Sequence, residues 1–529
     1  SKSIEEILMM RLDNLDYTRK NLLKVASCMG ESFDAWTLSK IYVPKMELSE
    51  ISLILDEMQD MGIEREEGSK YRFSNKLLRN VSYDSILVSN KRSLHLQIAG
   101  IIERRDQSDS AWETLARHYS LGENYEKAFD YAVRSARRAF AASAFYEAQR
   151  IYSDSSSFSK KAGCQLEEKD LLDYSKSLIS IGEYEKAMDI LGKLRDSSCE
   201  LTAVNARFLQ LMILDQRGEY KKSAEEAEAL FASANKIDCG EIALSSLRYE
   251  VSSFIRLGKY DEALPVLEKG FITSLQFELE GELPSLYILS GSIQYFKGEY
   301  AKSMEYYSSA LETSSKMSAY ELMIRSYFGL SNCHLALGEP ERSLTMAEKA
   351  YDISIKIGSR INILGAASNI AFATVSLGRP DDALQVLSNS ISLVNEKSAP
   401  YPVTTFFNQL GLTYYALGNM ELAVKYFRKT LSIARRIGNI QFIVNATYNI
   451  SDIHRELGDK KRARNGFVSI LKYCSSSVDR SFLKKIASEL LDLVEEDLER
   501  ERLFRLLRRT AVSLKSPLLF DDLIDRHGV

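Results

Sequence analysis

The sequence predicts an all-α fold: a right-handed α-solenoid of helical hairpins, preceded by a small domain of three helices and a β-hairpin. Three observations support this prediction. A short pattern with a glycine and a small residue returns every 40 residues through most of the chain. Each repeat contains two amphipathic segments, which a solenoid stacks into one continuous core. Residues 1–105 lack this period and are therefore expected to form a domain of their own.

Composition narrows the function classes. The chain has 529 residues and a formal net charge of −4, so it offers no overall attraction to nucleic acid or to an anionic membrane. Its six cysteines lie far apart in the sequence, which leaves no CxxC pair for a metal or for redox chemistry. Scattered cysteines are typical of a reducing compartment, and we expect a cytoplasmic protein without a cofactor or a metal. Because the first residue is serine rather than methionine, we expect the full-length protein to be longer.

The domain at 1–105 is predicted to be winged-helix-like, with linker helices. Residues 15–42 have the pattern of a helix, a glycine turn and a short helix, and residues 47–61 form a further amphipathic helix. Residues 63–75 alternate in polarity around a Glu-Gly-Ser turn, as a β-hairpin does. Three helices followed by a hairpin are the layout of a winged helix.

The helix at 47–61 is a poor candidate for reading DNA. It carries five acidic residues and no basic one, so the phosphates of a duplex would repel it. We therefore expect no direct nucleic-acid binding and a domain that packs against neighbouring parts of the protein. The acidic residues are Glu47, Glu50, Asp56, Glu57 and Asp60.

Residues 106–475 are predicted to form a superhelix of about nine to ten repeats. In each repeat a glycine, expected to end a helix in a left-handed cap, stands five positions before a small residue. Ser143 takes the place of this glycine in an early repeat. The small residues are Ala187, Ser223, Ala263, Ser303, Ser343, Ala383, Ala423 and Ala463, and from Ser223 on they are 40 residues apart.

A second small residue lies twelve positions before the first and predicts where the two helices of a hairpin approach each other. A second turn follows the second helix, so each helix has roughly 16 residues and a length of about 24 Å. The small residues on the first helix are Gly291, Ser331, Ala371, Gly411 and Ser451. The second turns are marked by Ser318, Gly358, Ser398 and Gly438.

The repeats resemble the tetratricopeptide repeat (TPR). The repeat that begins near Thr404 carries the residues typical of that family, and the period of 40 exceeds the usual period of about 34 residues. Longer helices are similar to those in the long-unit repeats of large signalling ATPases. The matching residues are Phe407, Leu410, Gly411, Tyr414, Ala423 and Phe427.

The N-terminal segment resembles the region that follows the nucleotide-binding module in STAND-class ATPases, such as large ATP-dependent transcription activators and multidomain adenylyl cyclases. Asn75 departs from the family, which often has histidine there, and the chain contains no GxxxxGK[ST] phosphate loop. The resemblance implies a winged helix and a sensor solenoid, with the ATPase module upstream in the full-length protein. The matching residues are Gly30, Phe33, Leu38, Phe73, Tyr83, Arg92, His95 and Ala99, followed by His118 and Ala128 at the entry to the repeats. We expect His95 to anchor a helix interface rather than to act as a base.

A binding surface is predicted on the concave face, which the first helix of each repeat lines. The lining segments at 361–376 and 401–416 contain no charged side chain, which indicates either burial or a groove that faces a ligand. Amide and aromatic groups would suit a protein, a peptide or a small neutral polar effector; in the other interpretation they only satisfy neighbouring groups of the chain. The candidate residues are Arg248, Ser252, Arg256, Arg325, Asn332, Asn369, Phe372, Asn408, Tyr415, Asn445, Tyr448, Asp452 and Arg455.

Residues 476–529 are predicted to be capping helices, because every solenoid needs a polar end. The rival interpretation is a docking helix for a partner, favoured by Arg502, Arg505, Arg508 and Arg509.

The sequence thus predicts a non-enzymatic sensor and interaction region of a signal-transduction or transcription-regulatory protein, not bound to a membrane. The chain shows no catalytic triad, no paired carboxylates and no metal spacing. The alternative is a scaffold that assembles a protein complex without a small effector.

Overall fold

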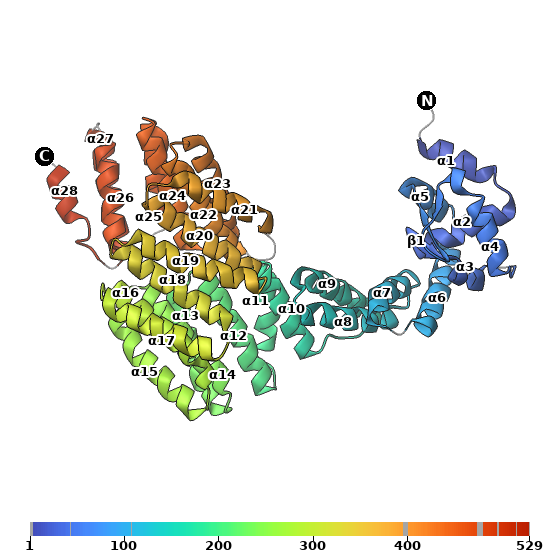
Figure 1. Cartoon of the computed structure of the whole chain (residues 1–529), viewed down its shortest axis with the longest axis horizontal. Coiled ribbons are helices and arrows are strands. Elements are labelled where there is room, and N and C mark those ends of the chain that lie inside the picture. The colour runs from blue at the N-terminus through green and yellow to red at the C-terminus, as the bar shows by residue number, and fades with distance from the viewer. Residues whose placement is uncertain are drawn as a thin grey trace. The chain divides into compact units, whose positions relative to one another are not determined.

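The computed structural model describes residues 4–42, 44–106, 108–394, 400–437, 439–472, 480–494, 497–514 and 516–527. Two compact units make up the chain, an N-terminal unit (Ser1–Ser177) and a C-terminal unit (Leu178–Val529) (Figure 1). Helices dominate both units, as predicted, and the one sheet of the described residues has three short strands. None of the described helices has the length and apolar character needed to cross a bilayer.

The N-terminal unit begins with helices and strands in the predicted order. The strands pair antiparallel in the order β1-β3-β2, and β2 and β3 form the predicted hairpin. The strand β1, which is only three residues long, was not predicted. The elements are α1 (Ile4–Asp13), α2 (Tyr17–Met29), β1 (Ser32–Asp34), α3 (Ala35–Ile41), α4 (Leu48–Asp56), β2 (Ile63–Arg65), β3 (Lys70–Phe73), α5 (Lys76–Asp84) and α6 (Val88–Arg105).

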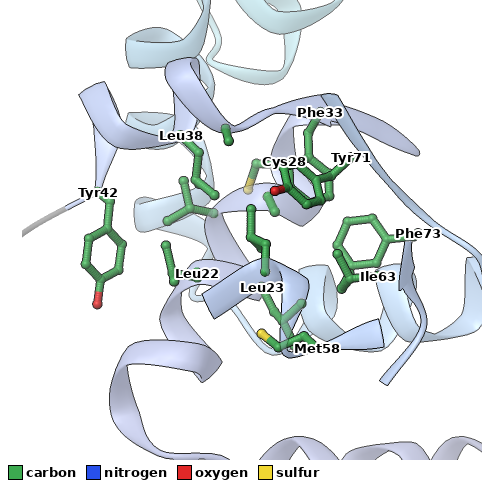
Figure 2. Close-up of a cluster of buried hydrophobic side chains, with 14 of the residues drawn as sticks. Leu22, Leu23, Cys28, Phe33, Leu38, Tyr42, Met58, Ile63, Tyr71 and Phe73 are labelled. Carbon is green, nitrogen blue, oxygen red and sulfur yellow. The ribbon is translucent and has the colours of Figure 1, made fainter. Parts of the chain in front are cut away.

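A hydrophobic core holds these elements together. Phe33 of β1 lies between two rings of β3, with ring centroids 6.0 Å from Tyr71 and 5.4 Å from Phe73. Figure 2 shows these rings beside Leu23 and Cys28 of α2. Burial raises the pKa of the Cys28 thiol to about 12, so this cysteine is a core residue rather than a nucleophile.

A buried polar chain connects the first domain to the next helix. His95 of α6 shares one hydrogen bond with Tyr83 Oη (3.0 Å from Nε2) and another with His118 Nδ1 (3.0 Å from Nδ1). Both imidazoles are 1% exposed, and burial lowers their pKa values to about 4 for His95 and about 3 for His118. These contacts confirm the prediction that His95 anchors a helix interface.

The N-terminal unit continues with the first helices of the array. Glu123 and Ser143 adopt left-handed conformations with φ of 60° and 57°, so Ser143 takes the backbone geometry of the glycine that it replaces. The helices are α7 (Trp112–Leu121), α8 (Tyr125–Ala141), α9 (Phe145–Ala162) and α10 (Glu168–Ser180).

The C-terminal unit is a stack of helical hairpins, most with helices of 17 residues, close to the predicted length. Its helices are α11 (Tyr184–Leu194), α12 (Glu200–Gln216), α13 (Tyr220–Lys236), α14 (Gly240–Arg256), α15 (Tyr260–Gln276), α16 (Leu283–Phe296), α17 (Tyr300–Lys316), α18 (Tyr320–Ala336), α19 (Pro340–Lys356), α20 (Arg360–Ser376), α21 (Pro380–Ser390), α22 (Pro400–Ala416), α23 (Met420–Ile437), α24 (Ile440–Glu456) and α25 (Lys460–Lys472).

The predicted turns are confirmed wherever the structure describes them. The repeat glycines take positive φ, for example 71° at Gly258 and 79° at Gly458, a conformation that is unfavourable for residues with a Cβ. Among the second turns, Ser318 and Gly358 have φ of 54° and 66°, whereas Ser398 and Gly438 lie outside the described residues.

The predicted close approach within each hairpin is also confirmed. Ser303 Oγ donates to the carbonyl of Gly291 at 2.7 Å, twelve positions earlier, and Ser331 Oγ donates to the carbonyl of Ser343 at 2.9 Å. A Cβ placed on Gly411 would lie 2.6 Å from the ring of Phe427, so only glycine fits there. The small residues therefore set the spacing between the paired helices.

The C-terminal tail packs on the last repeat. Buried side chains of its helices form one core with Phe467 of α25, as a cap would, and the four predicted arginines of α27 are exposed. The domain boundaries at 105 and 475 remain predictions. The tail helices are α26 (Arg480–Asp492), α27 (Asp497–Ser513) and α28 (Asp521–His527).

Candidate functional site

The candidate site lies on the inner layer of the C-terminal unit. The first helices of successive repeats pack on one another in the pairs α12/α14, α14/α16, α16/α18, α18/α20 and α20/α22. The second helices α13, α15, α17 and α19 lack comparable packing on one another in the described part of the chain. In a curved stack, the helices that touch across repeats lie on the concave side, so the first helices form the inner layer.

At one end of this layer, the predicted residues bind each other or nearby side chains. Tyr448 Oη donates to Glu489 Oε1 at 2.8 Å, and Tyr415 Oη donates to Glu456. Arg455 pairs with Asp452, and Gln441 donates to Asn445. These contacts match the alternative in which the polar side chains satisfy the chain itself.

The two segments without charges, 361–376 in α20 and 401–416 in α22, are explained mainly by burial. Most of the described residues of α20 and α22 are buried or half-buried. Asn369 is half-buried, and Phe372 keeps 45% of its surface exposed. The Asn408 Oδ1 atom is buried without a hydrogen-bond partner among the described residues. Ser252 is half-buried and Asn332 is exposed.

Three arginines of the inner layer form what we call the arginine cluster: Arg248 and Arg256 of α14, and Arg325 of α18. Arg248 donates to Glu282 Oε2 at 2.6 Å. Arg325 is exposed and has neither a hydrogen bond nor an ion pair with the described residues. Desolvation by the surrounding protein lowers the pKa of Arg325, and the positive charge of Arg248 lowers it further. A side chain on a concave surface has this combination, because water reaches it from the open side while protein surrounds it on the others.

Arg256 connects the cluster to α22. Burial lowers the pKa of its guanidinium, but Tyr401, Tyr220 and Asp215 raise it by more, which places Arg256 beside Tyr401 of α22. Asp215 has a raised pKa because it is desolvated, an effect that Arg256 opposes. The positive charge of the arginine cluster is therefore only partly balanced by the nearby acids Glu282 and Asp215.

A second contact between distant repeats closes the stack; we call it the clasp, formed by Gln216, Gly218, Asn439 and Ile440. Asn439 caps α24 by accepting from the Phe442 amide at 3.0 Å, and its Nδ2 donates to the Gln216 carbonyl at 3.3 Å. The side chain is 2% exposed, and Gly218 lies against the Ile440 amide. The repeats in this unit therefore turn back so that the start of α24 meets the end of α12.

Sequence reasoning missed the clasp and the acids of the site. Gln216 and Asn439 are 223 residues apart and share no position in the repeat, so no periodic signal relates them. Glu282 and Asp215 were likewise not predicted. Arg248, Arg256 and Arg325 were predicted from their places on first helices.

Comparisons with known proteins identify the repeats. Tetratricopeptide-repeat family models match residues 402–467 and 284–316, so the chain contains tetratricopeptide repeats, the architecture of a protein-interaction scaffold. This match confirms the predicted repeat near Thr404. No curated protein matches the sequence.

Several solved structures are similar over long stretches at low identity. A Rap protein complexed with competence and sporulation factor is 12% identical, with a TM-score of 0.44 over 70% of this chain and 100% of that one. A STAND protein with a tetratricopeptide repeat sensor from Pyrococcus horikoshii is 13% identical, with a TM-score of 0.37 over 89% of this chain and 65% of that one. The chain therefore spans less than two thirds of that protein. The APC/C hetero-tetramer Cut9-Hcn1 is 11% identical, with a TM-score of 0.41 over 90% and 93% of the two chains.

Proposed function

We propose that this chain is a non-enzymatic sensor and interaction region of a STAND-type signalling protein, and that a protein, peptide or small effector binds its concave face. Repeats of this type present an extended inner surface on which partners bind. The finer assignment rests on the sequence resemblance of the N-terminal segment and on the side chains of the inner layer.

One observation carries the proposed position of the site: Arg325 is exposed on the inner layer and has no partner among the described residues. The far end of the same layer, around Tyr448 and Asp452, is occupied by contacts within the chain. Binding is therefore proposed for the stretch between α14 and α18, where donors remain available.

The element order of the first domain supports the proposed winged helix. The sequence of elements α2, β1, α3, α4, β2 and β3 with strand order β1-β3-β2 fits the layout inferred from the pattern of residues. In this proposal the domain acts as a relay, because the bond between His95 and His118 couples α6 to the first helix of the array. A ligand-induced change in the repeats would then be passed on to an ATPase module.

The alternative function is a scaffold that holds proteins together without a small effector. The scaffold would use the same concave surface as the sensor, and the two functions differ only in the molecule that binds there.

A thermal-shift screen of the intact chain against metabolites and peptides tests both functions. A ligand that binds only the folded state raises Tm with its concentration. Stabilisation by a small molecule supports the sensor over a scaffold that has no small effector.

A pair of variants tests the proposed position of the binding site on the inner layer. Arg325→Ala should abolish the shift, whereas Arg428→Ala, which removes an exposed arginine of the second helix α23, should retain it. Equal shifts in both variants would place the site elsewhere.

A further inference from the structure

We propose that the N-terminal unit contains a separate binding site: an open pocket that takes a small organic anion with two or more negative charges. The pocket has a volume of about 750 Å³ and lies among the end of α3, the start of α4 and the end of α6. This volume is within the range of about 300–1,000 Å³ that small-molecule sites occupy. The site is independent of the arginine cluster and of the function proposed for the repeats.

Positive charge dominates the pocket wall. Four cations, Lys40, Lys45, Arg104 and Arg105, line it together with a single carboxylate, that of Glu47. Lys40, Lys45 and Arg104 are exposed, and in the described part of the chain no acidic side chain forms an ion pair with any of them. Like charges held this close repel one another, and a bound anion would remove that repulsion.

Two acids close to the cations, Glu47 and Asp34, make other contacts. Glu47 belongs to the capping box at the start of α4, where its side chain accepts from the backbone. Asp34 pairs with Arg105 and also accepts from Ser69 Oγ at 2.7 Å. Among the described residues, neither carboxylate forms an ion pair with Lys40, Lys45 or Arg104, so four cations face the single negative charge of Glu47 in the pocket wall.

An aromatic side chain adds an apolar wall. The Arg105 guanidinium carbon lies 4.6 Å from the centre of the Trp36 ring, and the Lys40 Nζ lies 5.3 Å from it. These cation–π contacts hold two of the four charges in place beside the pocket. An organic anion can contact the indole and the cations together, which a bare inorganic ion cannot.

The charges around the pocket favour a small anion over a nucleic acid. The exposed face of α4 next to the pocket carries Glu47 and Glu50, which would repel the extended phosphate backbone of a polynucleotide. A molecule that fits inside the pocket meets four cations and only one of these two carboxylates, that of Glu47.

The test uses tryptophan fluorescence, because the chain has only two tryptophans, Trp36 and Trp112. In the intact chain carrying Trp112→Phe, the emission reports on the pocket alone. ATP and citrate should each change this emission saturably, with an affinity that falls as salt rises, and adenosine should not. Calorimetric titration of the unchanged chain with ATP gives a second measurement.

Variants that each remove one positive charge test whether the cations of the pocket bind the anion. Lys45→Gln and Arg104→Gln should each weaken ATP binding about tenfold, the value of one lost charge-assisted hydrogen bond. Lys70→Gln, an exposed lysine of β3 outside the pocket, should bind ATP like the unchanged chain. The proposal is overturned if neither anion binds at low salt, if the pocket variants bind like Lys70→Gln, or if single-stranded DNA binds more tightly than ATP.

Discussion

Glu250 is a carboxyl group on α14 that is only 7% exposed. Burial raises its pKa to about 7, the negative charge of Glu228 adds to the rise, and Lys269 opposes it. The folded protein therefore prefers the protonated form. In the unfolded chain the carboxyl of Glu250 ionises near the ordinary pKa of 4.5. The stability that its raised pKa contributes is therefore fully present below about pH 4.5 and is lost as the pH rises through the folded-state pKa of about 7.

Glu250→Gln should raise Tm at about pH 8 and leave it nearly unchanged at about pH 4.5. The amide keeps the shape of the protonated acid but does not ionise, so the gain at pH 8 is at most about 3 kcal/mol. Thermal unfolding of the variant and of the unchanged chain at the two pH values measures this difference in Tm. The matched control is Glu241→Gln, which changes an exposed carboxyl on the same helix; equal effects of both variants would contradict the interpretation.

Two glycines in first helices should respond oppositely to alanine. At Gly411 a Cβ would lie 2.6 Å from the Phe427 ring, so Gly411→Ala should destabilise the protein by about 1–3 kcal/mol through overpacking. At Gly365 the nearest atom is 3.5 Å away, an ordinary contact, so Gly365→Ala should stabilise by up to about 1 kcal/mol through helix propensity. Urea unfolding of both variants checks this, and destabilisation of the same size in both would contradict the packing argument.

At the scale of the element, the hydrogen-bonded chain Tyr83–His95–His118 makes the junction between α6 and α7 sensitive to acid. The folded unit keeps both imidazoles neutral, with pKa values near 4 and 3, whereas the unfolded chain takes up protons near 6.5. The stability that they contribute is therefore present above about pH 6.5 and is lost as the pH falls through 4.

We expect the N-terminal unit to unfold at lower temperature as the pH falls from about 7.5 to 4.5. Both tryptophans belong to this unit, so their fluorescence follows its unfolding separately from the circular dichroism of the whole chain. In the double variant His95→Gln/His118→Gln, the dependence on pH should shrink. A slope equal to that of the unchanged chain would assign the acid sensitivity to other groups.

The elements were the most predictable part of the molecule. A glycine with positive φ and a pair of small residues recur in most hairpins of the C-terminal unit, so local chemistry fixes both the turn and the helix spacing. The strand β1 was missed because three residues carry no recognisable alternation, and its position depends on pairing with the distant Tyr71. The binding surface was only partly predictable: the sequence located arginines on first helices but not whether an acid such as Glu282 pairs with them.

At the scale of the whole C-terminal unit, the clasp joins the start of α24 to the end of α12, and we expect it to keep the superhelix closed. Asn439→Asp should open it, because the carboxylate still caps α24 but cannot donate to the Gln216 carbonyl and places a negative charge against it. We expect a larger radius of gyration in small-angle scattering with unchanged helix content. Asn439→Ser also caps but lacks the amide donor and the charge, so it should expand the protein less. Identical scattering of all three proteins would show that the clasp does not hold the superhelix closed.

The clasp also limits how this protein can change in length. A helical stack tolerates the gain or loss of a complete hairpin, since each hairpin packs only on its neighbours. Between Gln216 and Asn439, however, one added or deleted repeat would carry the two residues out of reach of each other. Duplications should therefore be accepted outside this interval, whereas a change in the number of repeats within it should break the contact between Asn439 and the Gln216 carbonyl.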